Sequence, residues 1–217
     1  MDQLYTTCNF LQKLTLSAFS NYEVKGQENI PPVGPLLIVS NHMSDIDPSM
    51  LAVAIPRRLR FLAKQSLFVG FPVSQLLSSY GAYPLNRQKS DIKAIKWAKE
   101  HLSSNGTIVI FPEGTRDGGS LISGKQGVAR LIQMTGSTIL PVGLTGTERF
   151  KSVLRVFNPT GKITVNIGTP FSLPTLEGKI TDSLMKSMTD MIMMRIAELL
   201  PEEYRGVYSL NKKRRAN

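Results

Sequence analysis

The chain contains 217 residues, of which 41% are hydrophobic, and its 26 Lys and Arg against 16 Asp and Glu give a formal net charge of +10. This length and composition predict one globular domain with a sizeable core, because no repeat, low-complexity stretch or Pro/Gly/Ser-rich linker divides the chain. A single cysteine excludes a disulfide within the chain, and one cysteine with two histidines leaves no ligand set for a metal cluster.

The first 20 residues are predicted to form an amphipathic helix, in which apolar residues are spaced among polar ones. These apolar residues are Leu4, Phe10, Leu11, Leu14 and Phe19. Such a helix either lies on a membrane surface or packs on the domain, and the sequence leaves both open. The chain has no run of about 18 apolar residues and no basic start before a long apolar centre, so we expect neither a membrane span nor a secretory signal.

Five apolar runs of strand length alternate with helix-like runs in the next part of the chain. They cover residues 36–40, 58–63, 107–111, 138–142 and 162–168. This alternation predicts an α/β fold, a single-domain sandwich with a mixed, mainly parallel sheet flanked by helices. We expect this domain to span residues 21–205.

A helix is predicted from a cap at Ser90 to about Ser103, which makes His101 a solvated residue near its end. A second helix near the C-terminus carries an apolar stripe that is expected to face the core. The stripe consists of Leu184, Met188, Met191, Ile192, Ile196 and Leu199. Residues 206–217 then form a basic tail, in which residues 212–215 favour a solvated segment with some attraction to anionic lipid.

His42 and Asp47 are the most informative pair in the chain. They lie between the buried run 36–40 and a helix-like run that starts at Pro48, in a stretch predicted to be a turn. Residues at this spacing diverge on a helix and lie on opposite faces of a strand, so only a turn brings the two side chains together. Asp47 then accepts a hydrogen bond from one ring nitrogen, and the other nitrogen can take a proton from an alcohol.

Other roles for these residues stay open on this reasoning alone. Asp47 before Pro48 is also an ordinary helix start, worth about 1 kcal/mol to the helix without any chemistry. His42 taken by itself is more often a structural residue than a base. Asp45 is a weaker alternative to Asp47 as the group that orients the imidazole.

Three further motifs follow, at residues 81–87 (Gly-Ala-Tyr-Pro-Leu-Asn-Arg), 111–116 (Phe-Pro-Glu-Gly-Thr-Arg) and 138–142 (Thr-Ile-Leu-Pro-Val). Together with His42 and Asp47, this ordered set resembles the glycerophosphate and lysophosphatidate acyltransferase family, whose first motif has the same four residues between His and Asp. The ordered set is far more specific than any one motif.

The resemblance implies that His42 is the general base, oriented by Asp47, and that the acyl group passes directly from donor to acceptor without an acyl-enzyme. The chain contains no Gly-x-Ser-x-Gly nucleophile elbow, which agrees with direct transfer. Ser44 and Cys8 are formal alternatives as nucleophiles, and a turn hydrogen bond is the simpler interpretation of Ser44. We expect no metal and no cofactor besides the acyl donor.

A glycerol-phosphate site is the second implication of the resemblance. Its residues are Arg87, Glu113, Gly114, Thr115 and Arg116, with Lys64 and Lys125 as weaker candidates. A planar guanidinium binds phosphate through two hydrogen bonds, and a glycine lets the backbone approach a ligand. Glu113 either holds a glycerol hydroxyl or ties down an arginine. The alternatives are a solvated turn residue for Arg87, a surface ion pair for Arg116 and a plain turn at Gly114.

Two residues depart from the family pattern. Asn86 stands where the family often has Asp, and Gly124 stands where the family often has an aromatic residue before the lysine that corresponds to Lys125. Neither change removes a proposed catalytic group, and both bear on which headgroup the site accepts.

Positive charge next to apolar residues indicates a membrane partner. Arg57, Arg58 and Arg60 precede an apolar loop at residues 67–71, which suits contact with lipid, burial in the core or an acyl-chain tunnel. We expect a peripheral or monotopic protein on the cytoplasmic face of a membrane, bound to membrane lipids and especially to anionic ones.

The sequence thus predicts an acyltransferase that moves a fatty acyl group from acyl-CoA or acyl-ACP to the free hydroxyl of 1-acyl-sn-glycerol-3-phosphate, forming phosphatidic acid in phospholipid biosynthesis. Another lysophospholipid, a lyso-ornithine lipid and glycerol-3-phosphate are alternative acceptors. The rival from another class is a non-catalytic protein that binds anionic membranes or nucleic acid through its basic residues. No specific nucleic acid is expected, because basic and aromatic residues do not interleave as in single-strand binders.

Overall fold

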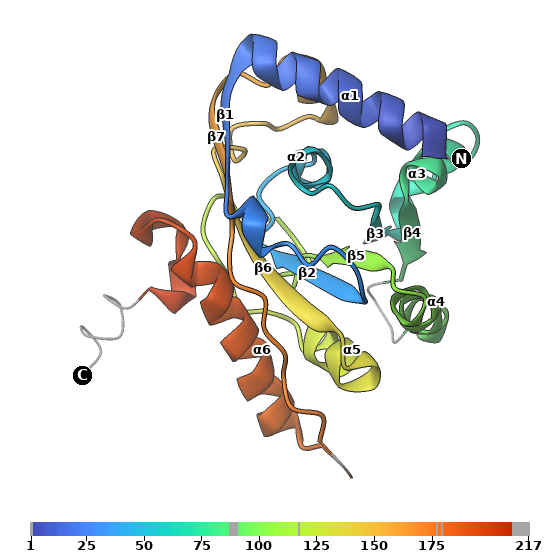
Figure 1. Ribbon diagram of the computed structural model, residues 1–217, viewed down its shortest axis with the longest axis vertical. Helices are drawn as coiled ribbons and strands as arrows, with labels where there is room; N and C mark the ends of the chain where they lie inside the picture. Colours follow the sequence, from blue (N-terminus) through green and yellow to red (C-terminus); the bar gives the residue numbers. More distant parts are fainter. Residues whose placement is uncertain (1, 87–90, 117, 177, 179, 210–217) are drawn as a thin grey trace.

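Among the residues that the structure describes, seven strands form one sheet of order β1-β7-β6-β2-β5-β3-β4 (Figure 1). The computed structural model describes residues 2–86, 91–116, 118–176, 178 and 180–209. The strands are β1 (Ser20–Lys25), β2 (Leu36–Ser40), β3 (Leu59–Lys64), β4 (Ala82–Leu85), β5 (Thr107–Ile110), β6 (Thr138–Thr145) and β7 (Gly161–Ile167). The α-helices are α1 (Asp2–Phe19), α2 (Asp47–Ala54), α3 (Val73–Tyr80), α4 (Ile92–Ser103), α5 (Gly127–Thr135) and α6 (Asp182–Glu198). Short 3-10 turns are η1 (Gln27–Asn29), η2 (Gln65–Leu67), η3 (Val153–Phe157), η4 (Glu202–Tyr204) and η5 (Gly206–Tyr208).

β2 lies at the centre of the sheet and pairs in parallel with β5 on one side and β6 on the other. All its residues, Leu36–Ser40, are buried, which explains the unbroken apolar run in the sequence. β3 and β4 continue the parallel part, whereas β7 runs antiparallel to β6 and parallel to β1. The predicted α/β fold with a mixed, mainly parallel sheet is therefore confirmed. Because β2 to β6 run in one direction, their carboxyl ends meet at one edge of the sheet.

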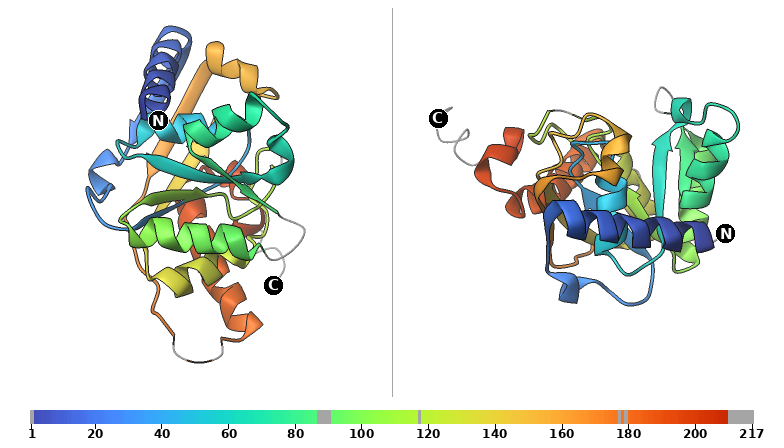
Figure 2. Two further views of the ribbon diagram at one scale, coloured as in Figure 1. Left: turned by 90° about the vertical axis from the view of Figure 1, so that its right-hand side faces the viewer. Right: turned by 90° about the horizontal axis from the view of Figure 1, so that it is seen from above.

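Side chains of β2 alternate between two layers of core. Leu36 and Ile38 pack with residues of α1 and α2, whereas Leu37 and Val39 pack with residues of α4, α5 and α6. Figures 1 and 2 show the same arrangement, with α1 and α6 on opposite sides of the sheet. The central strands are thus covered on both faces, as expected for a sandwich.

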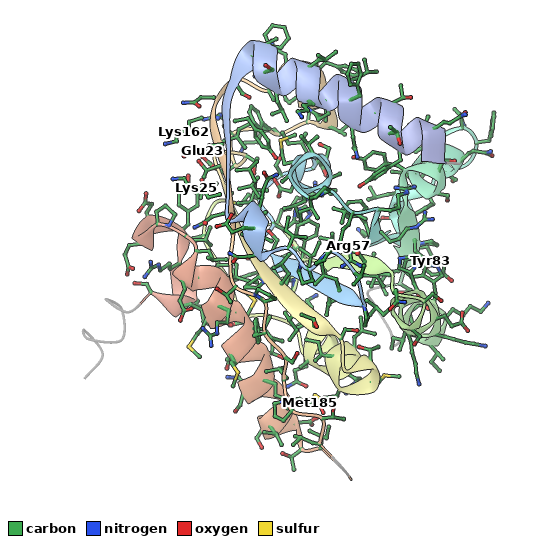
Figure 3. The ribbon with its side chains drawn as sticks, in the orientation of Figure 1. Glu23, Lys25, Arg57, Tyr83, Lys162 and Met185 are labelled. Atoms are coloured by element: carbon green, nitrogen blue, oxygen red, sulfur yellow. The ribbon has the colours of Figure 1, made fainter. Side chains whose placement is uncertain are left out.

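The sequence did not predict the two edge strands, β1 and β4. β1 offers only Tyr22 and Val24 as apolar residues, and its Glu23 forms an ion pair with Lys162 of β7 at 3.7 Å (Figure 3). β4 contains Pro84, which cannot donate a ladder hydrogen bond and is tolerated on an edge strand. β1 therefore lacks the apolar run by which the inner strands were found, and Pro84 obscures the strand pattern in β4.

α4 ends at Ser103 as predicted, but its start differs from the prediction. The predicted cap, Ser90, lies outside the described residues, and Asp91 caps α4 by accepting a hydrogen bond from the backbone N–H of Ala94 at 3.1 Å. The expectation that His101 is solvated was wrong. Its ring is half-buried and stacks on Trp97 with the ring centroids 5.6 Å apart, and its Nε2 finds no hydrogen-bond partner within the described part of the chain.

The apolar stripe of α6 faces the core along most of its length. Met188, Ile192 and Ile196 are buried as predicted, whereas Leu184 and Met191 are 41% and 44% exposed. The buried face is completed by Met185, Thr189 and Met193. The helix is thus rotated slightly from the predicted orientation.

The C-terminal segment is longer in its folded part than the sequence suggested. Residues 206–209 were assigned to the tail, yet the N–H of Val207 donates to the carbonyl of Leu121 and Ser209 is buried. The basic residues 212–215 lie outside the described part of the chain. In the described ranges, no helix has both the length and the apolar character needed to cross a membrane.

The arginines before the apolar loop do not present free charges to it. The Arg57 guanidinium donates to the carbonyls of Pro31, Gly34 and Asn105. The Arg58 guanidinium donates to the carbonyls of Ser79 and Tyr80 and lies over the Tyr5 ring, 3.7 Å from its centroid. In the loop, Val69 and Phe71 are 68% and 84% exposed, so this loop is neither core nor tunnel wall at these two positions.

Candidate active site

His42 and Asp47 meet in the turn between β2 and α2. Nδ1 of His42 lies 2.8 Å from Oδ2 of Asp47, and the same oxygen accepts hydrogen bonds from the N–H groups of Met43 at 2.7 Å and Ser44 at 2.8 Å. Asp47 is fully buried. One carboxylate therefore holds the turn and the imidazole together, as the turn prediction required.

The proton on the imidazole is located by this geometry. Because Asp47 can only accept, Nδ1 of His42 carries the hydrogen, and Nε2 is left as the basic nitrogen. Asp47 is the first residue of α2, where the positive end of the helix dipole favours a negative charge. The N-cap position itself is Ile46, so Asp47 does not cap the helix in the way that its sequence context suggested.

Phe111 also contacts the imidazole of His42. Its ring stacks on the His42 ring, with centroids 4.1 Å apart and planes 18° from parallel, and the His42 side chain is only 13% exposed. The stacking restricts rotation of the imidazole and shields one of its faces from water. The first and third motifs therefore form one site.

Glu113 forms a second link between the first and third motifs. Its Oε1 accepts a hydrogen bond from the backbone N–H of His42 at 2.9 Å, and its Oε2 accepts one from the N–H of Ile122 at 3.1 Å. Glu113 is buried. The sequence offered a glycerol hydroxyl or an arginine as its partner and missed this structural role, because residue types alone do not show which backbone groups approach a carboxylate.

The last three residues of the third motif lie closer to the surface than Glu113. Gly114 has a φ of +67°, which favours glycine, and a Cβ there would come within 2.9 Å of Cδ and Cε of Lys125, so the lysine side chain would have to move. Arg116 forms an ion pair with Asp45 between side chains that are both partly exposed. Thr115 is exposed. Asp45 thus pairs with the third motif, and it is Asp47 that contacts the imidazole.

The structure says little about two predicted binding residues, Lys64 and Arg87. Lys64 ends β3 and is exposed at the same sheet edge as the His42 turn. Arg87 lies outside the described residues, so its role stays a prediction.

Asn41 and Ser44 have roles that the sequence did not assign. The Asn41 side-chain amide donates to the carbonyl of Leu144 and accepts from its N–H, both at 2.8 Å, which links the end of β2 to β6. Ser44 Oγ donates to the carbonyl of Phe150 at 2.7 Å, a long-range bond, and it also accepts a turn hydrogen bond from the N–H of Ile46 at 3.5 Å, which was the simpler interpretation of this serine. Both residues are buried.

Comparison with known proteins agrees with this geometry. Residues 21–145, more than half of the chain, match the acyltransferase family. The chain belongs to the acyltransferase family. It is 26% identical over 197 residues to the 1-acyl-sn-glycerol-3-phosphate acyltransferase of Bacillus subtilis, covering 90% of this chain and 96% of that protein. It is 30% identical over 180 residues to the enzyme of the same name from Borreliella burgdorferi, covering 80% and 70%.

Longer relatives and a solved structure extend the comparison. The human 1-acyl-sn-glycerol-3-phosphate acyltransferase beta is 30% identical over 150 residues, which is 67% of this chain but 54% of the human protein. The crystal structure of the 1-acyl-sn-glycerophosphate acyltransferase PlsC from Thermotoga maritima matches with a TM-score of 0.70 and 23% identity, covering 90% of this chain and 78% of that one. The likeness in structure confirms the acyltransferase fold.

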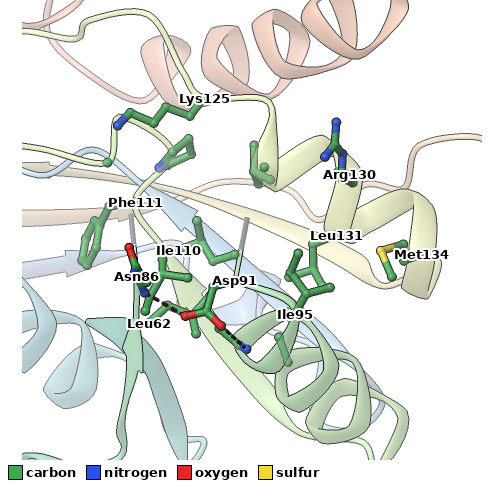
Figure 4. Close-up of a pocket in the computed structure, with 17 residues that line it drawn as sticks. Leu62, Asn86, Asp91, Ile95, Ile110, Phe111, Lys125, Arg130, Leu131 and Met134 are labelled. Atoms are coloured by element: carbon green, nitrogen blue, oxygen red, sulfur yellow. Dashed lines mark hydrogen bonds between the residues drawn. The ribbon is translucent and has the colours of Figure 1, made fainter. Parts of the chain in front are cut away.

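A largely apolar cavity of about 430 Å³ opens beside the acyltransferase motifs (Figure 4). It begins at Phe111 and Gly114 and runs between β3, α4 and α5, where Leu62, Ile95 and Leu131 line it. Polar side chains at its wall are Asn86, Asp91, Lys125 and Arg130. The cavity therefore joins the imidazole's stacking partner to a space suited to a hydrocarbon chain.

Gly124, a departure from the family pattern, has a packing reason in this chain. A Cβ at Gly124 would approach Met193 of α6 at 2.8 Å, so an aromatic residue does not fit there. Tyr208 lies beside it instead, where its OH accepts from the N–H of Gly124 at 3.3 Å and contacts Asp190 at 3.0 Å. Burial raises the pKa of Tyr208 to about 12, so the phenol stays protonated and donates to Asp190.

Proposed function

We propose that this protein transfers a fatty acyl group from an acyl thioester to the free hydroxyl of 1-acyl-sn-glycerol-3-phosphate and so forms phosphatidic acid in phospholipid biosynthesis. The observation that carries this proposal is the 2.8 Å contact between Nδ1 of His42 and Oδ2 of Asp47 in a site built from the family motifs. The relatives that cover most of this chain bear the name of this activity.

The proposed reaction starts with the acceptor hydroxyl next to Nε2 of His42. As the hydroxyl oxygen attacks the thioester carbonyl carbon, its proton moves to Nε2, and Asp47 stabilises the resulting imidazolium. The tetrahedral intermediate then expels the thiolate, which takes the proton from Nε2. The C–S bond is replaced by a C–O bond, and the products are an ester and a free thiol, so no external oxidant or metal is needed.

Direct transfer is preferred to an acyl-enzyme because the candidate nucleophiles are occupied or remote. Ser44 is buried and its hydroxyl hydrogen is committed to the carbonyl of Phe150. Cys8 lies on α1, outside the turn that carries His42 and Asp47. Neither side chain is bonded to His42, the partner that would activate it.

The acceptor phosphate is proposed to bind among the cations near the third motif. Nζ of Lys125 lies 3.1 Å from the position of a Cβ on Gly114, so the ammonium is close to the turn that follows the stacked Phe111. Arg116 reaches the first motif through Asp45, and its guanidinium has further donors for a phosphate. Arg87, Thr115 and Lys64 remain proposed members of this binding set, in accordance with the family pattern.

The acyl chain is proposed to occupy the cavity between α4 and α5. Its volume of about 430 Å³ and its largely apolar lining suit a hydrocarbon chain whose carbonyl end lies near Phe111. Acyl-CoA and acyl-ACP are both proposed donors, because they present the same thioester. Other lysophospholipids, lyso-ornithine lipid and glycerol-3-phosphate remain alternative acceptors.

Peripheral attachment to the cytoplasmic face of an anionic membrane completes the proposal, and α1 supports it. Gln12 of α1 is buried and donates to the carbonyl of Val156 at 3.1 Å, whereas Phe10, Leu11 and Leu14 are 60%, 53% and 51% exposed. Buried Tyr5 and Leu16 hold the inward face of α1 on the core, yet the helix still presents a row of apolar side chains to solvent, which a helix that only packs on a domain would not need.

The test is transfer of labelled acyl groups from acyl-CoA and acyl-ACP to a panel of the lysolipids named above and glycerol-3-phosphate, in mixed micelles. We expect product with 1-acyl-sn-glycerol-3-phosphate at the highest kcat/KM. A folded protein that binds vesicles but makes no product with any acceptor would contradict the proposal and favour the non-catalytic binder.

A further inference from the structure

The segment between β6 and β7 connects the catalytic turn to the N-terminal helix. At its start, the carbonyl of Phe150 accepts the 2.7 Å hydrogen bond from Ser44, which lies between His42 and Asp47. Towards its end, the carbonyl of Val156 accepts bonds from Gln12 at 3.1 Å and Thr15 at 2.9 Å, both on α1. We call residues 149–157, which include η3, the η3 segment.

Apolar side chains of the η3 segment point to solvent. Val153, Leu154 and Phe157 are 56%, 68% and 67% exposed. Figure 2 shows η3, in orange, at the same end of the molecule as α1, which presents its own apolar residues outward. Exposed apolar side chains of both elements thus lie at one end of the molecule, and such a grouping on a protein surface often marks a contact with lipid or protein.

The charged residues within the η3 segment all have one sign. The η3 segment contains Arg149, Lys151 and Arg155 and no acidic residue, and Lys13 of α1 is also exposed. Arg155 donates to Thr160 at the base of the segment. Exposed Arg149 and Lys151 flank the apolar residues, an arrangement that suits apolar insertion beneath anionic headgroups.

We propose that the η3 segment is a second lipid-contacting element, which inserts Leu154 and Phe157 into an anionic bilayer next to α1. A second copy of the chain is a poorer occupant, because a two-fold contact would bring Lys151 and its neighbouring cations of both copies together. Only the purpose of this lipid contact rests on the proposed function. Because the η3 segment is hydrogen-bonded to Ser44, its insertion places His42 close to the membrane surface, where a lysolipid acceptor resides.

The test compares two double variants of the whole chain in vesicle sedimentation, with phosphatidylcholine vesicles that contain or lack phosphatidylserine. Leu154→Ser with Phe157→Ser removes the proposed insertion, whereas Val33→Ser with Ile92→Ser removes two other side chains that are 79% and 75% exposed. We expect the first pair to weaken binding to anionic vesicles about tenfold or more, and the control pair to leave it near wild type.

The role of the positive charges and the rate of acyl transfer are measured separately. Lys13→Gln with Lys151→Gln should reduce the preference for phosphatidylserine vesicles at low salt, and the same change at Lys96 and Lys186, on α4 and α6, should not. All variants should keep the wild-type rate on a short-chain acceptor in solution, since none touches the His42 site. Vesicle binding without any acyl transfer would overturn the proposed function and leave this inference standing.

Three results would overturn the inference. Vesicle binding that is unchanged in Leu154→Ser with Phe157→Ser, or that falls equally in the control pair, would show that the segment does not contact lipid. A dimeric wild type that these two changes convert to a monomer would make the surface a contact between copies of the chain.

Discussion

The backbone N–H of His42 donates a 2.9 Å hydrogen bond to Oε1 of Glu113, seventy-one residues further along the chain. The bond couples the turn that carries the base to the motif that carries the proposed phosphate site. Because Oε2 of the same carboxylate holds Ile122, the loop after Glu113 is tied to the catalytic turn through one buried side chain.

Glu113→Gln should separate these two loops. A glutamine has one acceptor oxygen and an NH2 group, so one of the two backbone N–H groups would face a donor instead of an acceptor. We expect a loss of about 1–3 kcal/mol in the free energy of unfolding, together with a lower kcat. Chemical denaturation and steady-state kinetics check this, with the exposed Glu198→Gln as control. Wild-type stability and kcat in Glu113→Gln would show that these two hydrogen bonds contribute neither to stability nor to catalysis.

Gly114→Ala should raise the KM for the acceptor. The positive φ of Gly114 costs about 1–2 kcal/mol for any other residue, and the added methyl group would push the Lys125 side chain away. Gly118→Ala is the matched control, because a Cβ there meets nothing within 4 Å. Kinetics with varied acceptor concentration distinguish the two, and an unchanged KM in Gly114→Ala would exclude Lys125 and this turn from acceptor binding.

Ile95→Trp should shift donor preference to shorter chains, because Ile95 lines the cavity proposed to hold the acyl group. A larger ring there occupies space that a long chain needs. Ile92→Trp lies on the same helix, is 75% exposed and does not line the cavity, so it should keep the wild-type profile. The profile is measured as kcat/KM for thioesters of increasing chain length. A wild-type profile in Ile95→Trp would place the acyl chain elsewhere.

His101 should make the fold less stable in mild acid. Burial lowers the pKa of His101 below its ordinary value of 6.5, and nearby Arg60 lowers it further. As the pH falls below 6.5, the unfolded chain takes up a proton that the folded chain does not, so stability is lost until the folded pKa is passed. His101→Phe keeps a ring against Trp97 and removes the titration. Its unfolding free energy should fall less than that of wild type between pH 8 and pH 5.5, and equal slopes would contradict this origin of the acid sensitivity.

The buried part of the fold was predictable from the sequence because it rests on local patterns. The apolar run of β2 and the turn at His42 and Asp47 follow from burial and residue spacing, which are written in adjacent residues. The edge strands β1 and β4 were missed because they are only partly buried and carry charges or a proline. The rotation of α6 depends on which neighbours it meets, which periodicity alone does not specify.

The site was predictable in its residue types and less so in its contacts. The pairing of Asp45 with Arg116 and the stacking of Phe111 on His42 join segments far apart in sequence. The bonds of Glu113 to two backbone N–H groups are of the same kind. The exposure of Phe10, Leu11 and Leu14 on α1 also required the structure, because the periodic pattern of the helix does not say which face meets the domain.

The central claim is that His42 acts as the general base, and the rate of acyl transfer by His42→Ala tests it most directly. The measurement uses saturating acyl-CoA and 1-acyl-sn-glycerol-3-phosphate, with melting temperature and vesicle binding recorded for the same preparation. The account predicts a fall of about 10²–10⁴-fold in rate with folding and lipid binding preserved. A rate near wild type in the folded variant would contradict it.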